Sequence, residues 1–534
     1  MRSEHGRDGR FVFGVAVLTV SNLFVKFCGL FLKVPLTNTL GDTGMAYFNL
    51  AYAVYKWFYM ISTAGLPVAA AILTARYAGE GEPHLRAAQL RRVRNVTFCA
   101  FLVLGTLGAV CMYFGAPVFA SLQHVPQAAP SIAALAPALF CICIASALRG
   151  WYQGLGCQTP TALAQAAEAL GKLLCGLYFA GYALRAGAPI HTAAAYGVAG
   201  LSVGCFAGMV VMLLSHPIVT RRYGICSGSR IALQKTPLIG ALWRIALPVT
   251  LSASVMSLTD MLDSMIVIRR LCATGVAHAE ALRLYGSYTA LAVPMFNLPP
   301  ILIYPMTTAL IPVISSVGEQ RERCHAIVRA SLSLTVMIAM PCAAGMSIMA
   351  EPILRLFYRA DLARTGAPML SVLALAVLFL SLLAMSNAIL QALDAARAPL
   401  CSILFGAAVK LGASWLLTGQ PEVGMLGIPL STVLCYAAMA VCNLYFVLRV
   451  TRAQLPLGVM LCKPGLAAVF CALTARAAYG MLLQYLPAQL CTLVSIAAGG
   501  AVYLAALIAL GGIGADVLSL LPHGKRKPPI SITQ

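Results

Sequence analysis

The sequence predicts an all-α polytopic membrane protein, and three observations lead to this prediction. Of its 534 residues, 60% are hydrophobic and only 10% are charged, and the mean hydropathy of +0.86 exceeds the range of soluble globular domains. Apolar runs long enough to cross a hydrocarbon core of about 30 Å, which takes about 20 residues, recur along the whole chain. These runs lack the alternation of barrel strands, so helices are expected to satisfy their backbone hydrogen bonds in lipid.

We expect fourteen transmembrane helices with short connections and no large domain outside the membrane. The first is too long, and too interrupted by Lys26, to be a cleaved signal peptide. The expected spans are residues 11–36, 46–75, 95–120, 130–155, 160–184, 193–219, 240–268, 286–316, 328–350, 366–393, 399–418, 425–449, 461–485 and 489–520.

Basic residues determine the expected orientation. Arg and Lys concentrate in the connections after the second, sixth and eighth spans and in both terminal segments. The positive-inside rule assigns such segments to the cytoplasm, and an even number of spans puts both termini there. The protein is therefore expected in the cytoplasmic (inner) membrane. Its net charge of +21 is explained by basic loops that face anionic headgroups, so no nucleic-acid partner is expected.

The sequence shows no sign of a catalytic, metal or cofactor site. Most of the 18 cysteines fall inside spans without paired spacing and are interpreted as small packing residues. The His residues show no ligand spacing, and no Walker-type loop indicates ATP hydrolysis. We therefore expect no metal and no cofactor, although coupling to Na⁺ or H⁺ remains an option for a transporter.

An internal repeat organises the chain. Residues 153–172 and 391–410 each begin with Gln, contain a Pro seven or eight residues later and end with Lys. A shift of about 238 residues aligns further segments, so the repeat covers six helices. Six crossings return the chain to the same side, which predicts two lobes related by a pseudo-two-fold axis along the membrane normal. The expected lobes are residues 1–235 and 236–455, followed by two extra helices and a basic tail in residues 456–534.

Several motifs resemble those of the stage V sporulation protein B group of polysaccharide transporters. They are the stretch from Lys26 to Leu36, the run from Leu40 to Val68, the segment from Arg149 to Thr161, and Leu258 to Asp263. That group is similar to MurJ-type lipid II flippases and, more distantly, to multidrug and toxin extrusion transporters. The resemblance covers essentially the whole chain and implies a flippase that carries undecaprenyl-pyrophosphate-linked sugars.

Ionisable residues inside spans are costly, so each is a candidate for a site or an ion pair. Asn22, Lys26 and Lys33 share one face of the first span. Lys33 could instead extend its ammonium group to the interface.

The second span carries a polar and aromatic stripe. Its three- and four-residue spacing predicts one helix face, made up of Asn49, Tyr52, Lys56, Tyr59 and Thr63. The stripe either packs against other helices or forms one wall of a central cleft. In the second interpretation Lys56 and Lys26 meet a pyrophosphate, as the resemblance also implies.

The second lobe has a different polarity. It carries Asp260 and Asp263 in the seventh span and Asn297 in the eighth. Asp263 is expected either to pair with Lys410 or to belong to a cation site. The first lobe is therefore the expected anion-binding half.

The fourth and fifth spans add three further charged candidates. Glu168 and Lys172 are four residues apart and are expected to pair along one helix. Arg149, at the end of the fourth span, is interpreted as either a headgroup ligand or a cytoplasmic gate residue.

The leading hypothesis is a non-enzymatic flippase that moves a lipid-linked saccharide, most simply the peptidoglycan precursor lipid II, from the inner to the outer leaflet. Its expected partners are this substrate, membrane lipids and cell-wall synthesis proteins. The alternative is a cation-coupled exporter of drugs or other small molecules, which would favour an acidic cleft over the cationic one expected here. A membrane enzyme would need a polar cluster in a sizeable outer loop, and a scaffold without transport is a further alternative.

The topology can be tested with reporter fusions in cells. A phosphatase that is active only outside the cytoplasm should be inactive at either terminus, whereas a fluorescent protein that folds in the cytoplasm should be active at both. Opposite locations of the two termini would contradict an even number of spans.

Overall fold

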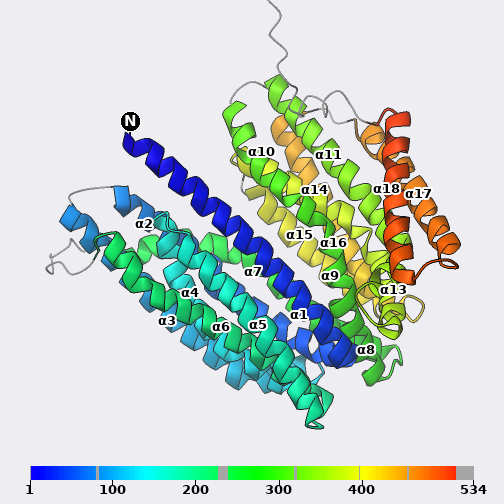
Figure 1. The fold of residues 1–534 in the computed structure, drawn as a ribbon, viewed down its shortest axis with the longest axis horizontal. Helices are drawn as coiled ribbons and strands as arrows, with labels where there is room; N and C mark the ends of the chain where they lie inside the picture. Colours follow the sequence, from blue (N-terminus) through cyan, green and yellow to red (C-terminus); the bar gives the residue numbers. More distant parts are fainter. Residues whose placement is uncertain are drawn as a thin grey trace, which may run out of the picture. The chain divides into compact units, whose positions relative to one another are not determined.

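The structure is a computed structural model, which describes residues 2–79, 83–225, 238–317, 321–395, 397–453 and 456–512. Every regular element in these ranges is helical (Figure 1). The chain divides into two compact units, Met1–Ala290 with Thr418–Glu422, and Leu291–Leu417 with Val423–Gln534. The lobe boundaries at residues 235 and 455 follow from sequence symmetry rather than packing, and they stay a prediction.

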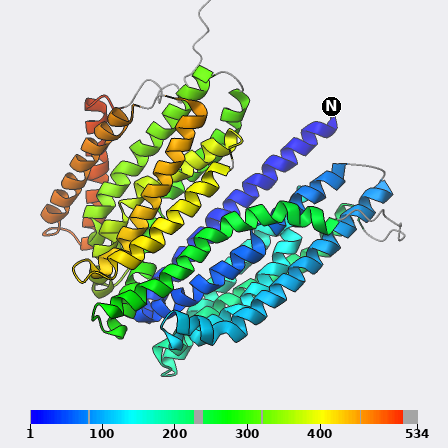
Figure 2. The same cartoon turned by 180° about the vertical axis from the view of Figure 1, so that it is seen from behind.

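The first unit consists of long helices, several of which lie side by side in both views of the chain (Figures 1 and 2). They are α1 (Arg2–Thr63), α2 (Leu66–Gly79), α3 (Pro83–Leu122), α4 (Ala129–Gly154), α5 (Thr159–Arg185), α6 (Ile190–Arg222), α7 (Leu238–Ala273) and α8 (His278–Ser287), with a 3₁₀ turn at Pro126–Ala128.

The first two predicted spans are joined in one kinked helix. Within α1, Gly41 has φ 69° and ψ −176°, a non-helical conformation that kinks the helix at this point. A side chain at this φ would be strained, so glycine is the residue suited to the kink. The second predicted span is then interrupted at Ala64 and Gly65, between α1 and α2.

Helices α5 and α6 approach closely because glycines face one another. A Cβ atom on Gly200 of α6 would collide with the backbone nitrogen of Gly176 on α5, and one on Gly204 would collide with that of Lys172. Small residues allow such backbone contact between membrane helices. The seam therefore fixes the position of the polar face of α5.

The second unit contains α9 (Val293–Phe296), α10 (Tyr304–Val317), α11 (Arg321–Ile348), α12 (Ala350–Arg355), α13 (Ala360–Leu373), α14 (Ala376–Ala392), α15 (Arg397–Leu417), α16 (Gly427–Thr451), α17 (Leu457–Leu482) and α18 (Ala488–Ala509). A π segment at Tyr288–Ala292 precedes it, and 3₁₀ turns occur at Pro299–Leu302 and Gly424–Leu426. The eighth predicted span is thus broken into short helices, consistent with its several prolines.

The two C-terminal helices pack on the other helices of the second unit. Helices α17 and α18 contact each other and α11, and their shared core contains Cys471, Tyr503 and Leu507. The Tyr503 hydroxyl donates a hydrogen bond to the backbone oxygen of Met337 on α11, at 2.7 Å. A buried phenol with a partner of this kind holds the added pair of helices against the bundle.

By length and composition, the described residues contain 11 helices that could cross a membrane, or up to 12 if α13 and α14, bent by 48°, are one span. Val20–Ala78 forms a single candidate stretch, and α5 is not among the candidate helices because its charged residues lower its hydropathy. These two features account for most of the difference from fourteen, which stays a prediction.

The glycine seam gives a test of the packing. Gly200→Leu should lower the melting temperature of the purified protein in detergent, because overpacking a close contact costs about 1 to 3 kcal/mol. Gly181→Leu is the matched control, since a Cβ atom at Gly181 on α5 meets nothing within 4 Å. Equal melting temperatures for the two variants would contradict the close approach of α5 and α6.

Candidate functional site

A cavity of about 370 Å³ opens within the first unit, between α1, α4, α5 and α6. Its volume lies within the range of ligand pockets, about 300 to 1,000 Å³. The lining combines apolar, aromatic and charged side chains and consists of Val25, Cys28, Gly29, Leu32, Lys33, Phe48, Tyr52, Tyr59, Arg149, Gln165, Glu168, Ala169, Lys172 and Leu201.

The charges in this cavity do not balance. Lys33, Arg149 and Lys172 supply three cations, and Glu168 is the single carboxylate in the lining. The ammonium group of Lys172 lies 2.6 Å from Glu168 Oε1, which forms the pair expected from their four-residue spacing. This pair neutralises itself, so Lys33 and Arg149 leave the cavity with an excess of positive charge. Such a cavity favours an anion.

Two buried polar atoms of the lining have no hydrogen-bond partner in the described part of the chain. They are Arg149 Nε, a donor, and Gln165 Oε1, an acceptor. A buried polar group without a partner costs about 1 to 3 kcal/mol, so a ligand or water is expected to satisfy it. Because Arg149 lines the cavity, its side chain is available to a molecule bound there.

The packing of neighbouring helices holds these side chains in place. A Cβ atom on Gly208 of α6 would lie 2.9 Å from the Cβ of Glu168, so α6 presses directly on the base of this side chain. Next to Arg149, a Cβ on Gly150 would lie 2.6 Å from the backbone oxygen of Pro67, so α4 rests against α2. The charged side chains thus extend from closely packed helices, as expected for a preformed site.

Aromatic rings follow the α1 wall of the cavity. Tyr52 and Tyr59 belong to the lining, and Tyr55 lies between them, with ring centroids 5.6 Å from Tyr52 and 6.0 Å from Tyr59. Phe48 extends the row at 6.4 Å from Tyr52. Phe48 and Tyr55 are buried, whereas Tyr52 is 39% exposed. Tyr52 and Tyr59, which line the cavity, can therefore pack on a sugar and hydrogen-bond to it through their hydroxyl groups.

Lys56 has a different environment from the cavity. Its ammonium group contacts Asp260 Oδ2 of α7 at 2.8 Å, and the two side chains remain 39% and 34% exposed. The pair therefore connects α1 with α7 at a half-exposed position. From the sequence we expect Lys56 to act together with Lys26. Its pairing with Asp260 is not visible in the sequence because 204 residues separate the partners.

The other α1 candidates lie outside the cavity lining. Asn22 and Lys26 are exposed, about three and two turns before Lys33, respectively. Asn49 is buried, and its Nδ2 has no partner among the residues that the structure describes. Contact between these three residues and a substrate stays a prediction.

The candidates of the second predicted lobe are not part of the lining of this cavity. Asn297, at the break after α9, is exposed, and its side-chain amide donates to the backbone oxygen of Val293 at 2.7 Å. Lys410 is buried in the second unit and Asp263 in the first. Their pairing stays a prediction.

Sequence reasoning did not identify Gln165 as part of the site. It precedes Glu168 by three residues, and Lys172 follows Glu168 by four, so all three share one face of α5. This spacing is the feature of the sequence from which Gln165 could have been identified as a site residue.

Within the described ranges, no group of three or more His, Cys, Asp or Glu residues could hold a metal ion.

Comparisons with known proteins agree with the fold and the resemblance. A family model described as polysaccharide biosynthesis protein matches residues 11–317. Stage V sporulation protein B of Bacillus subtilis (strain 168) is 24% identical over 447 residues, covering 79% of this chain and 80% of that protein. Lipid II flippase MurJ of the same organism is 22% identical over 418 residues, covering 74% and 75%.

Solved structures show the same architecture. A structure of lipid II flippase MurJ in an inward closed conformation matches with a TM-score of 0.68 and 13% identity, covering 93% of this chain and 99% of that one. An inward-facing MATE family transporter of the MOP superfamily matches with a TM-score of 0.64 and 17% identity, covering 83% and 98%. The chain therefore shares the all-helical, multi-pass membrane fold of these two proteins. Because the family model matches more than half of its residues, the chain belongs to the polysaccharide biosynthesis protein family.

Proposed function

We propose that this protein is a flippase that moves an undecaprenyl-pyrophosphate-linked saccharide, most simply lipid II, from the inner to the outer leaflet of the cytoplasmic membrane. The observation that carries the proposal is the cavity of the first unit, with its excess positive charge and its wall of tyrosines. A pyrophosphate needs cationic partners and a sugar needs aromatic and hydroxyl partners, and this cavity offers both. Family membership and the names of the relatives support the same assignment.

Lys33 and Arg149 divide the anion recognition in this proposal. Arg149 presents a planar guanidinium group that can bind two phosphate oxygens at once, whereas Lys33 acts as a compact point charge. Gln165 and Tyr52 then contact the neighbouring sugar. The volume of about 370 Å³ suits a pyrophosphate with part of one sugar, so the rest of a large headgroup and the lipid chain would remain outside this cavity.

The charge of the cavity also indicates whether the transported molecule is a lipid-linked anion or a cationic drug. A cationic drug would need acidic partners, but three of the four ionisable Lys, Arg and Glu side chains in the lining are basic, and the one acid is already paired. We therefore favour a lipid-linked anion over a cationic drug. In this proposed function both termini lie in the cytoplasm. Coupling of transport to Na⁺ or H⁺ is a separate property to measure.

Substrate movement can be tested in bacteria depleted of their own lipid II flippase. The wild-type chain should restore labelling of lipid II in the outer leaflet, whereas Lys33→Gln and Arg149→Gln should each reduce it at least tenfold because an anion contact is lost. Both variants should accumulate normally, since each removes a charge that is costly to bury in a membrane protein.

Arg221→Gln is the matched control, because Arg221 is exposed at the end of α6. Its labelling should equal that of the wild type. Wild-type labelling by both cavity variants would exclude the cavity as the anion site. Failure of the wild-type chain itself, with restoration of a different lipid-linked glycan, would exclude lipid II as the substrate.

The ion pair between Lys56 and Asp260 allows a separate test of whether these residues serve helix packing alone or also substrate transport. We expect Lys56→Asp combined with Asp260→Lys to restore the melting temperature lost in Lys56→Asp, because the attraction between α1 and α7 is re-formed. Transport should nevertheless stay low, because the exchange puts a carboxylate on α1 between Tyr52 and Tyr59 of the cavity lining, where it opposes the approach of an anion. Recovery of transport by the exchanged pair would show that the two residues serve helix packing alone.

A further inference from the structure

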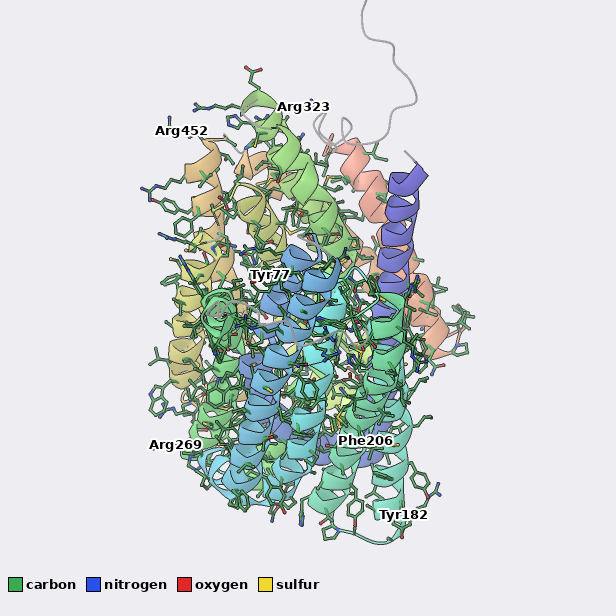
Figure 3. All side chains as sticks on the ribbon, turned by 90° about the vertical axis from the view of Figure 1, so that its left-hand side faces the viewer. Tyr77, Tyr182, Phe206, Arg269, Arg323 and Arg452 are labelled. Carbon is green, nitrogen blue, oxygen red and sulfur yellow. The ribbon has the colours of Figure 1, made fainter. Side chains whose placement is uncertain are left out.

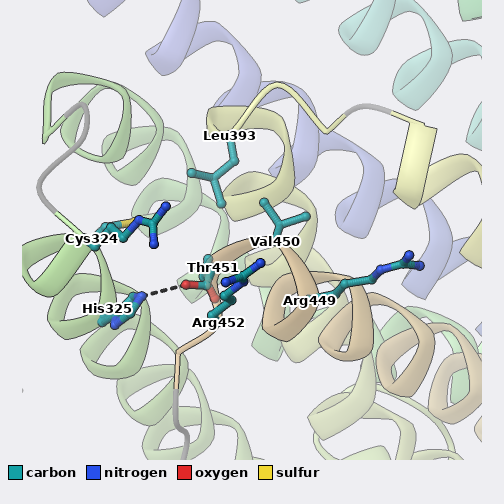
Figure 4. Close-up of a pocket in the computed structure, with 8 residues that line it drawn as sticks. Cys324, His325, Leu393, Arg449, Val450, Thr451 and Arg452 are labelled. Carbon is teal, nitrogen blue, oxygen red and sulfur yellow. Dashed lines mark hydrogen bonds between the residues drawn. The ribbon is translucent and has the colours of Figure 1, made fainter.

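A second cavity, of about 600 Å³, lies entirely within the second unit. Three helices meet there at their ends: the first turn of α11, the residue that follows α14, and the last turn of α16. The lining consists of Arg321, Cys324, His325, Leu393, Arg449, Val450, Thr451 and Arg452. Figure 4 shows these residues around the opening. None of the functions assigned above uses this cavity.

The lining is strongly basic. Arg321, Arg449 and Arg452, from two helices, belong to the lining, and none of the described lining residues is Asp or Glu. The nearest carboxylates in sequence are Glu322, which is exposed on α11, and Asp394, which lines a neighbouring cavity. In Figure 3, Arg323 and Arg452 lie at the same end of this unit, which extends the positive surface. The local potential therefore favours an anion.

The backbone at this point is arranged to reduce repulsion of an anion. Carbonyl groups at a helix C-terminus normally carry partial negative charge. Here the Thr451 carbonyl accepts a hydrogen bond from His325 Nε2 at 2.6 Å, and the Leu448 carbonyl accepts one from the Arg452 backbone at 2.8 Å. Arg452 reaches that position in a left-handed conformation with φ 55°. The last turn of α16 thus presents arginines while two of its carbonyls, those of Leu448 and Thr451, have hydrogen-bond partners.

The contacts distinguish this cavity from a simple basic loop. The hydrogen bond between His325 and Thr451 joins residues 126 positions apart, so it fixes the start of α11 against the end of α16. The start of α11 adds the positive end of a 28-residue helix. Leu393 and Val450 supply apolar surface beside the charges. A bare ion would leave most of the cavity volume empty. A phosphate ester would contact the arginines through its phosphate and the apolar side chains through its organic group.

We propose that this cavity binds the phosphate group of an organic phosphate, carried either by the headgroup of an anionic phospholipid or by a soluble phosphate ester. Arg321 and Arg452 hold the phosphate oxygens through charge-assisted hydrogen bonds. Leu393 contacts the attached organic group. The site is separate from the cavity of the first unit and does not depend on the identity of the transported substrate.

The test uses the full-length purified protein in a neutral detergent. In one arm, native mass spectrometry measures binding of phosphatidylglycerol, with phosphatidylcholine as the zwitterionic comparison. In the other arm, calorimetry measures binding of glycerol 3-phosphate, which carries the same group without acyl chains. The double variant Arg321→Gln/Arg452→Gln should weaken binding about tenfold or more in at least one arm, the size expected when a charge-assisted hydrogen bond is lost.

A control with the same change in net charge is Arg364→Gln/Arg476→Gln, because both residues are exposed in the same unit outside this cavity. It should bind like the wild type. Leu393→Trp fills the cavity without removing charge and should also weaken ligand binding. This variant distinguishes binding inside the cavity from a general effect of protein charge. A loss confined to phosphatidylglycerol identifies a lipid ligand, and one confined to glycerol 3-phosphate identifies a soluble ligand. If neither cavity variant differs from the control in either arm, the proposal is wrong.

Discussion

The close contact between α5 and α6 is the constraint on which the site depends. Facing glycines allow the two backbones to touch, and this contact sets the face of α5 that carries Glu168 and Lys172. In lipid there is little hydrophobic drive to bring helices together, so such backbone contact supplies much of the association. The cavity bounded by α1, α4, α5 and α6 exists because one pair of helices is packed this tightly while α1 contributes larger side chains around it.

Charge balance explains why the residues of this cavity divide into two groups. Glu168 and Lys172 form a self-contained pair and can remain in the bundle without a ligand. Lys33 and Arg149 have no carboxylate left for them in the lining, and Arg149 Nε is buried without a partner in the described residues. Retaining such groups in a membrane protein is costly. The cost is reasonable where a bound anion offsets it during part of a transport cycle.

The sequence was sufficient for features that depend on local spacing or composition. It predicted the helical membrane fold, and the spacing of Glu168 and Lys172 predicted their contact. It was less informative where distant segments meet. Lys56 and Asp260 are 204 residues apart, and no pattern in either helix indicated that they pair. Hydropathy could not show the kink at Gly41 either, because a single backbone angle decides whether two apolar runs form one helix or two.

The two cavities place positive charge in different physical settings, and this difference bears on their roles. In the first unit, the cations lie on helix interiors beside tyrosines, where an uncompensated charge is expensive and tight binding of an anion is correspondingly favourable. In the second unit, the arginines are exposed at helix ends, where solvent screens them and binding is expected to be weaker. A transported anion must be held strongly enough to leave water, whereas a phosphate bound at helix ends only has to remain associated. The burial of the charges, rather than their number, therefore separates the proposed transport site from the proposed phosphate site.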